Sequence, residues 1–311
     1  MQSVKLTPMI EQYLSIKGNF ADCILFYRMG DFYEMFFEDA ITASRVLEIT
    51  LTSRNKKDDD AVPMCGVPHR AAQGYIAKLI ENGFKVAICD QVEDPSAAKG
   101  LVKRDVVRVI TPGMIVENEL LDSRSPNYVL SVFCHGKKIG VAYLDISTGS
   151  FRLTELAKPE QAVDEILRIN PKEILLPEGI TSQDPEYKDL AMALDNRPLS
   201  HVDAGEFSPA TARKRLLSLF NTLSLEGFGC EKLKAAVGAA GAIVAYVLEM
   251  QKQAISHISS IETYHTGQYL LLDESSCRNL ELFANIWSGG KQGTLLDVLD
   301  NLLPRFLRPA V

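Results

Sequence analysis

Residues 26–36 read Phe26-Tyr27-Arg28-Met29-Gly30-Asp31-Phe32-Tyr33-Glu34-Met35-Phe36. The apolar run at 23–27 that leads into this stretch contains two aromatic residues and predicts a β-strand. Gly30 permits a sharp exit from that strand, because it has no Cβ. Apolar side chains then recur at helical spacing up to about Leu47, which predicts a helix from Asp31 onward. In that helix Asp31 is the expected cap, and Glu34, three residues later, completes a capping box.

Phe32 fits the predicted helix poorly as a core residue. It lies at the edge of the apolar stripe, in the first turn, where side chains point past the helix end. An aromatic ring at such an exposed corner, with the carboxylate of Glu34 two residues later, suits recognition of a partner. The residues alone leave both interpretations of Glu34 open, a helix cap or a recognition group.

The rest of the chain divides into three predicted domains. The first, 1–123, has a predicted helix at 71–82 and strands at 85–89 and 106–110, and a polar segment that ends at Pro126 marks its boundary. The second, 124–240, is also α/β. Its strands are expected at 128–134, 139–146, 151–156 and 173–176, with a hairpin turn at 135–138 and a helix at 161–169. The third, 241–311, begins a mainly helical region; a predicted helix at 231–255 leads into it, and it includes a strand-like run at 268–272.

The composition is that of an ordinary globular protein. The 311 residues include 33 Lys and Arg against 40 Asp and Glu, and this net charge of −7 argues against a wholly basic nucleic-acid-binding protein but permits a local basic surface. The six cysteines form no CxxC pair, which favours free thiols in a reducing compartment. The N-terminus lacks a signal-peptide pattern, and the longest apolar region, 235–250, is too short to span a membrane. We therefore expect a soluble, cytoplasmic protein.

The sequence lacks the common catalytic motifs. It contains no P-loop, HExxH, GxSxG or GxGxxG pattern, and its five histidines are too far apart in sequence to suggest a shared metal ion. We expect neither a catalytic residue nor a metal site. One alternative stays open: a metal-dependent nuclease would need the carboxylates of Asp145, Asp164 and Glu165 to converge.

Four motifs of the first domain occur in an order and spacing that resemble one known family. They are Arg28-Met29-Gly30-Asp31-Phe32-Tyr33-Glu34, Pro63-Met64-Cys65-Gly66-Val67-Pro68-His69, Val86-Ala87-Ile88-Cys89-Asp90-Gln91 and Val107-Arg108-Val109-Ile110-Thr111-Pro112-Gly113. Together they resemble the N-terminal mismatch-recognition domain of the MutS family of DNA mismatch repair proteins. Residues 140–149 are similar to the family's connector domain, and 271–282 to the start of its helical core. The resemblance implies an α/β protein with a mixed-sheet recognition domain, an RNase H-like α/β connector domain and the start of a mainly α-helical core.

The resemblance also assigns roles to individual residues. Phe32 and Glu34 match the family's Phe-x-Glu mismatch reader, in which the ring wedges into DNA from the minor groove and the carboxylate hydrogen-bonds to the base. Met29 and Gly30 are expected to pack beside this wedge and to permit close approach of DNA. The candidates for contacts to the DNA backbone are basic residues of the same domain: Arg28, Arg54, Lys56, Lys99, Lys103, Arg104 and Arg108.

The resemblance implies a longer protein than this chain. Members of the family continue into a DNA clamp and an ATPase that uses ATP and Mg²⁺, form dimers, and bind a MutL-type repair partner through the connector domain. Because the 311 residues contain no P-loop, we expect no enzymatic activity and no cofactor here. Ser276 and Cys277 depart from the family's pattern, and residues 302–311 contain two prolines. These departures indicate an engineered truncation, a split gene or a disrupted reading frame.

Two functions remain open. The first is a non-enzymatic module that recognises mismatched or unpaired bases. The alternative is a partner-binding fragment that acts through the connector domain, without independent mismatch recognition. The effect of Phe32 on DNA binding separates the two.

Overall fold

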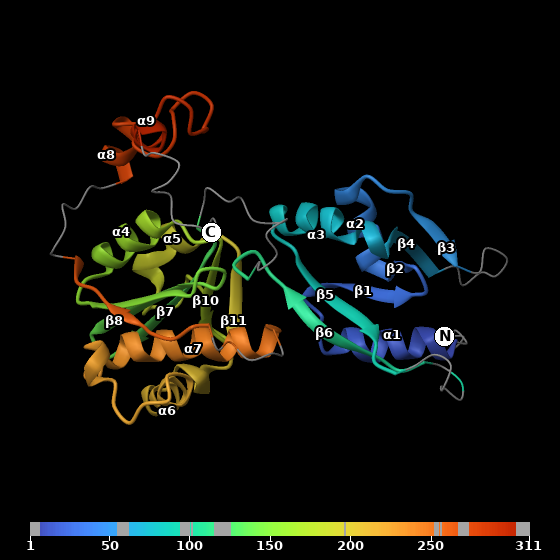
Figure 1. Ribbon diagram of the computed structural model, residues 1–311, viewed down its shortest axis with the longest axis horizontal. Coiled ribbons are helices and arrows are strands. Elements are labelled where there is room, and N and C mark those ends of the chain that lie inside the picture. Colours follow the sequence, from blue (N-terminus) through green and yellow to red (C-terminus); the bar gives the residue numbers. More distant parts are fainter. Residues whose placement is uncertain are drawn as a thin grey trace. The chain divides into compact units, whose positions relative to one another are not determined.

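The computed structural model describes residues 7–54, 62–93, 100, 102–114, 126–195, 197–251, 255, 257–266 and 274–302. The chain forms two compact units, Met1–Asn127 with Ala245–His257 and Tyr128–Val244 with Ile258–Val311. Each unit contains one six-stranded sheet with helices packed on it (Figure 1). The described part of the chain contains no helix that is both long and apolar enough to cross a membrane.

The first unit contains a mixed sheet with the strand order β3-β4-β2-β1-β5-β6. Its strands are β1 (Cys23–Met29), β2 (Phe32–Phe36), β3 (Thr52–Arg54), β4 (Val62–Pro68), β5 (Lys85–Gln91) and β6 (Arg104–Ile110). β1 runs parallel to β5, and the other neighbouring strands are antiparallel. The mixed α/β architecture expected for this domain is therefore present.

Helices cover both faces of this sheet (Figure 1). Helix α1 (Pro8–Gly18) packs on one face, which we call the α1 face, where Tyr13 is buried against Leu25 and Tyr27. Helices α2 (Phe37–Leu47) and α3 (Ala72–Glu81) pack on the other, the α2/α3 face, over Phe26 and Tyr33. Because strand side chains alternate between faces, each strand contributes to both cores.

The predicted helix at 31–47 is wrong for its first six residues. Gly30, with φ +57°, and Asp31 form a two-residue hairpin loop closed by the pair Met29 and Phe32, and β2 follows. Glycine at the first loop position suits such a hairpin. The helix begins only at Phe37, and its N-cap, Phe36, makes no side-chain capping bond. Asp31 and Glu34 therefore form no capping box; instead the Asp31 carbonyl accepts a hydrogen bond from the backbone N–H of His69 (2.8 Å).

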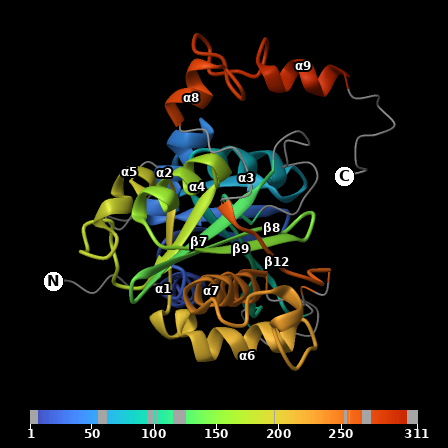
Figure 2. The same ribbon diagram turned by 90° about the vertical axis from the view of Figure 1, so that its left-hand side faces the viewer.

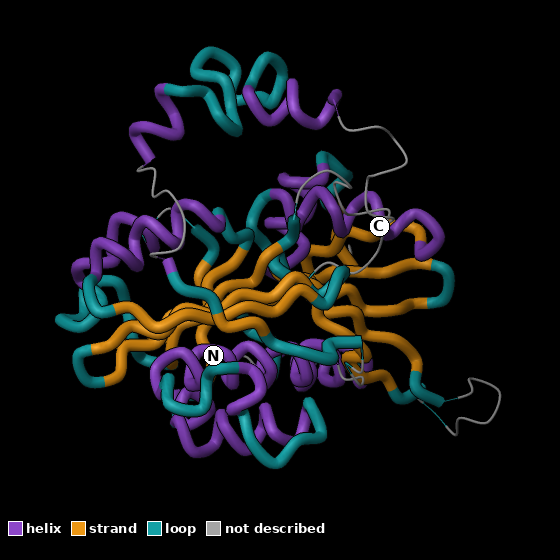
Figure 3. Tube along the Cα trace, turned by 60° about the vertical axis from the view of Figure 1, so that its left-hand side comes forward, coloured by secondary structure: helices purple, strands orange, loops and turns teal. Residues whose placement is uncertain are grey.

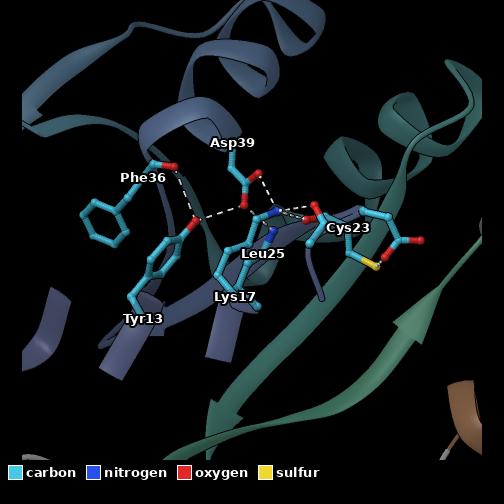
Figure 4. A network of polar contacts seen from close by, with 8 residues as sticks. Tyr13, Lys17, Cys23, Leu25, Phe36 and Asp39 are labelled. Carbon is cyan, nitrogen blue, oxygen red and sulfur yellow. Dashed lines mark hydrogen bonds and ion pairs between the residues drawn. The ribbon is translucent and has the colours of Figure 1, made fainter. Parts of the chain in front are cut away.

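A buried polar network holds the junction between β2 and α2 (Figure 4). One carboxylate oxygen of Asp39 accepts hydrogen bonds from the Tyr13 hydroxyl (2.9 Å) and the Leu25 backbone N–H (3.0 Å), and the other pairs with Lys17 Nζ (2.8 Å). Phe37 has φ +53°, a left-handed conformation that costs a non-glycine residue about 1–2 kcal/mol. The network stabilises this junction, because it ties α1, β1 and α2 together where β2 ends.

The second unit contains the sheet order β11-β10-β7-β8-β9-β12. Its strands are β7 (Tyr128–His135), β8 (Lys138–Asp145), β9 (Ser150–Leu156), β10 (Glu173–Pro177), β11 (Leu199–Val202) and β12 (Glu262–Thr263). β7, β8 and β9 form an antiparallel meander, whereas β10 runs parallel to β7 and β11 parallel to β10. This is the strand arrangement of an RNase H-like domain, as expected.

Helices also cover both faces of the second sheet (Figures 2 and 3). α4 (Pro159–Ile169) and α5 (Ala191–Leu194) lie on one face, and α6 (Pro209–Leu219) and α7 (Lys234–Gln251) lie on the other. Gly140 of β8 allows α7 to approach closely, since a Cβ there would lie only 2.1 Å from the Ala235 backbone. The last part of α7, from Ala245, belongs to the first unit.

Within the described residues after 257, the expected helical region contains two short helices, α8 (Glu274–Asn279) and α9 (Leu295–Leu302), so its helical content is modest. The strand-like run at 268–272 lies outside them. The predicted domain boundaries at 123 and 240 stay predictions; the compact units divide at Asn127 and, inside α7, at Val244.

Candidate nucleic-acid interface

Phe32 and Glu34 lie on the same face of β2. Successive strand residues point to opposite sides, so residues two apart share a face, whereas a helix would place them about 200° apart. Phe32 is 47% exposed, Tyr33 between them is buried, and Glu34 is half-buried. Both side chains belong to the α1 face, at the end of the sheet formed by the Gly30 turn. The strand, rather than the predicted helix, therefore brings the aromatic ring and the carboxylate together.

The strand register defines the neighbours of this pair. On β1, Met29 lies opposite Phe32 and Tyr27 opposite Glu34. On β4, Gly66 lies opposite Glu34, and a Cβ there would stand 3.6 Å from Glu34 Cγ and 3.3 Å from the Tyr33 carbonyl oxygen. The tight contact is the one with the Tyr33 carbonyl oxygen, so Gly66 allows the backbones of β4 and β2 to approach closely beside Glu34. The sequence identifies Gly66 only as part of a motif, because its position opposite Glu34 depends on the pairing of two strands that are far apart in sequence.

Met29 and Gly30 lie beside Phe32 in the hairpin, and their expected role in the approach of DNA stays a prediction. Met29 packs at the margin of the α1-face core. Gly30 is exposed, and a Cβ added to it would meet no atom within 4 Å. Within the protein, Gly30 thus contributes turn geometry, because its positive φ favours glycine.

Arg28 and Arg108 lie on the opposite face of the sheet from Phe32. Arg28 is paired with Tyr33, and its Cζ lies 5.6 Å from the centre of the Tyr33 ring. Arg108 is paired with Ile88, which belongs to the core under α2 and α3. To contact the backbone of a DNA duplex bound at Phe32, either guanidinium would therefore have to extend past the end of the sheet.

The position of Arg104 argues against the phosphate contact expected from sequence. Arg104 is only 8% exposed, and its guanidinium lies 4.9 Å from the Tyr27 ring centre. It donates from Nε to the Arg28 carbonyl (2.7 Å) and from Nη1 to the Val102 carbonyl (3.0 Å). Because a buried cation must keep such partners, these bonds hold the guanidinium inside the fold. Arg104 ties β6 to the end of β1.

Of the remaining basic candidates, Lys103 is the one whose side chain the structure describes. Lys103 is exposed; its backbone N–H donates to Glu93 (2.5 Å) and its carbonyl accepts from Val92 (3.0 Å), so the side chain extends from an anchored segment. Arg54 is the last residue of β3. The structure does not describe its side chain, nor any part of Lys56 and Lys99.

In the described part of the second unit, the carboxylates that a nuclease would need are not gathered into a metal-binding group. Asp145 is buried and accepts hydrogen bonds from the Ser147 backbone N–H (2.9 Å) and hydroxyl (2.6 Å) in the turn after β8. Glu165 is buried and pairs with Arg168 (2.7 Å) and Tyr264 (2.9 Å), whereas Asp164 is exposed. No group of three or more potential metal ligands occurs among the residues with described placement.

An exposed aromatic–carboxylate hairpin lies in a mixed-sheet domain, and an RNase H-like domain follows it, which is the order of domains that the resemblance implies. Comparison with known families agrees: the model of MutS domain I matches residues 7–119 and that of MutS domain II matches 127–259. The chain belongs to the MutS family.

Curated relatives extend the same likeness over almost the whole chain. DNA mismatch repair protein MutS of Desulfatibacillum aliphaticivorans is 53% identical over 300 residues, and that of Desulfosudis oleivorans is 54% identical over 300 residues; each alignment covers 96% of this chain. The MutS protein of Symbiobacterium thermophilum is 44% identical over 304 residues. The chain spans about a third of the length of these relatives, 34% in each case.

Proposed function

We propose that this chain recognises mismatched or unpaired bases in duplex DNA, with Phe32 as a minor-groove wedge and Glu34 as the hydrogen-bonding partner of the displaced base. One observation carries the proposal: an exposed phenyl ring and a carboxylate occupy one face of a short strand at a hairpin tip. An aromatic ring in this position contributes little to the core and is available to a ligand.

The energetics of wedging explain why such a site would select mismatches. Insertion of an apolar side chain unstacks a base step at a cost of a few kcal/mol. A mismatched step is already poorly stacked and bends easily, so the cost is lower there. Stacking of a base on the Phe32 ring returns about 1–3 kcal/mol. The preference then follows from DNA deformability rather than from base sequence.

Glu34 adds a second criterion. A carboxylate near phosphates is repelled unless it meets a hydrogen-bond donor, so it penalises duplex that offers none. Because Glu34 and Phe32 share one face of β2, the carboxylate can meet a base next to the Phe32 ring. The basic residues then position the duplex through phosphates. We propose this role for Lys103, and also for Arg28, Arg54, Lys56, Lys99 and Arg108.

For the second unit we propose a partner-binding function. Two of the carboxylates that a nuclease would need there, Asp145 and Glu165, make hydrogen bonds within the fold. We propose that this RNase H-like domain binds a MutL-type repair protein. Dimer formation and the use of ATP and Mg²⁺ are proposed for the longer MutS proteins, and no cofactor is proposed for these 311 residues.

Fluorescence anisotropy tests the recognition proposal. The 311-residue chain is titrated at low salt with a matched duplex and with the same duplex carrying a G·T mismatch or a single-base bulge, because phosphate contacts weaken steeply with salt. Phe32→Ala should remove the preference for the mismatch and leave affinity for matched DNA nearly unchanged. Phe283→Ala is a matched control, since Phe283 is 56% exposed in the second unit. Equal binding of both duplexes by the unmodified chain would contradict the proposal and favour the partner-binding alternative.

A further inference from the structure

Tyr33 lies between the two proposed recognition residues but points to the other side of the sheet. It is only 4% exposed, and its hydroxyl donates to Asp90 Oδ1 at 3.0 Å. Tyr33 belongs to β2 and Asp90 to β5, and β1 lies between these strands. The bond therefore passes over β1 and joins β2 to β5, two strands that are not neighbours in the sheet.

The Tyr33 ring is also enclosed by its neighbours. The Phe26 ring centre lies 5.7 Å away, the His69 ring centre lies 5.2 Å away, and Arg28 Cζ lies 5.6 Å from the Tyr33 ring centre. His69 begins the short 3-10 helix η1 (His69–Ala71), whose first backbone N–H is bonded to the Asp31 carbonyl. Burial and the neighbouring Asp90 raise the pKa of Tyr33 above its ordinary value.

The backbone register explains why such a side-chain bond matters. The pairing of β1 with β5 runs from Cys23 and Lys85 to Tyr27 and Cys89, and the hairpin tip begins at the next residue, Arg28. From there, Tyr33–Asp90 links the tip to β5 on the α2/α3 face, and Arg104 bonded to the Arg28 carbonyl links it to β6 on the α1 face. The tip that carries Phe32 is thus tied to the sheet by side chains on both faces.

We propose that Tyr33, through its bond to Asp90, is a positioning residue for mismatch recognition. It fixes the strand on which Phe32 and Glu34 stand, so that both meet the base in one geometry. Without the bond the tip would move, and mismatch selection would weaken while phosphate contacts persist. The inference rests on the proposed function of Phe32 and Glu34.

Tyr33→Phe and Asp90→Ala remove the bond, whereas Asp90→Asn keeps an acceptor oxygen and serves as a conservative rescue. Tyr75→Phe is the matched control, since Tyr75 also packs on the α2/α3-face core but its hydroxyl makes no hydrogen bond within the described residues. All are made in the full 311-residue chain. Amide hydrogen exchange of residues 29–34 reports tip mobility, and anisotropy gives the Kd for matched and mismatched duplexes.

Tyr33→Phe and Asp90→Ala should speed exchange at 29–34 by about fivefold, as expected for loss of one buried hydrogen bond. The ratio of matched to mismatched Kd should fall by a similar factor, with the matched Kd unchanged, and Asp90→Asn should restore most of both. The inference is overturned if Tyr33→Phe exchanges like Tyr75→Phe, or if Phe32→Ala lowers the ratio while Tyr33→Phe does not. If Phe32→Ala leaves the ratio unchanged, the proposed function fails instead. Tyr33 is then judged by exchange alone: faster exchange supports its hold on the tip, and unchanged exchange overturns it.

Discussion

The molecule contains two hairpins with similar turns but different surroundings. Both loops have two residues, with glycine first in a positive-φ conformation, Gly30 at +57° and Gly136 at +62°. The β1–β2 ladder has three pairs, from Tyr27 and Glu34 to the tip, whereas the β7–β8 ladder has eight. The first tip presents a half-exposed phenylalanine, and the second presents Lys137 and Lys138.

The two hairpins are therefore stabilised in different ways. The long β7–β8 ladder is stabilised along its length by buried side chains such as Val132 and Val141. The β1–β2 ladder is short, and β2 is also held by its five-pair ladder with β4, by the Asp39 network at the base of the hairpin and by Tyr33–Asp90 near the tip. An exposed phenyl ring adds little to stability, so Phe32 is available for the binding role that we propose for it.

The largest effect is expected where the base of the first hairpin is tied. Asp39→Ala would leave the Leu25 N–H, the Tyr13 hydroxyl and Lys17 without their shared acceptor, so it should lower the free energy of unfolding by about 3 kcal/mol. Lys78→Ala, which breaks an exposed pair with Glu48, should cost less than about 0.5 kcal/mol. Urea denaturation followed by circular dichroism measures both, and equal losses would show that the network does not hold the hairpin.

The two tips should differ most clearly in DNA binding. Phe32→Ala should cost about 1–3 kcal/mol of mismatch preference, the value of one base stacked on an aromatic ring, and change unfolding by no more than about 0.5 kcal/mol. Lys138→Ala, at the other tip, should change neither mismatch preference nor stability. Anisotropy with matched and mismatched duplexes gives the first quantity and thermal unfolding the second. If Lys138→Ala also lost the mismatch preference, recognition would depend on the second unit, which would contradict the role proposed for Phe32.

The two turn glycines allow a matched pair of substitutions. A Cβ at Gly30 or Gly136 would meet no atom within 4 Å, so alanine introduces only the strain of a positive φ, about 1 kcal/mol at either position. Gly30→Ala and Gly136→Ala should therefore lower stability equally in denaturant titrations. Only Gly30→Ala should also reduce mismatch preference, because only that turn sets the direction of Phe32. Unequal losses of stability would mean that the backbone at one of the two turns adjusts more to the alanine than the other does.

The comparison also explains what the sequence could and could not predict. The hairpin at 135–138 was predicted correctly, because polar residues and a glycine separate two clear apolar runs. The first hairpin was missed because Tyr33, Phe36 and Ala40 fit a helical stripe, while the five residues of β2 are too few to establish a period of two against it. Local patterns therefore favoured one continuous helix.

The site shows the same limit. The resemblance selected Phe32 and Glu34, yet the reason for their spacing, a shared strand face, required the structure. Gly66 and Asp90 act through pairing between β2 and β4 and across β1 to β5, and such long-range register leaves no local signal. Arg104 was grouped with exposed basic residues because nothing in a run of lysines and arginines shows which one is buried.

The smallest effect is expected at an exposed lysine. Lys103→Ala should raise the Kd for matched and mismatched duplexes by the same factor, about threefold at low salt, because a phosphate contact carries no information about the base. The slope of log Kd against log salt should fall by about 0.9, the contribution of one neutralised phosphate. Lys137→Ala, at the tip of the second hairpin, should leave the slope unchanged. If Lys103→Ala changed the two duplexes unequally, that side chain would contribute to the recognition assigned to Phe32 and Glu34. Base recognition would then involve a wider surface of the first unit that includes Lys103, and not the tip of its hairpin alone.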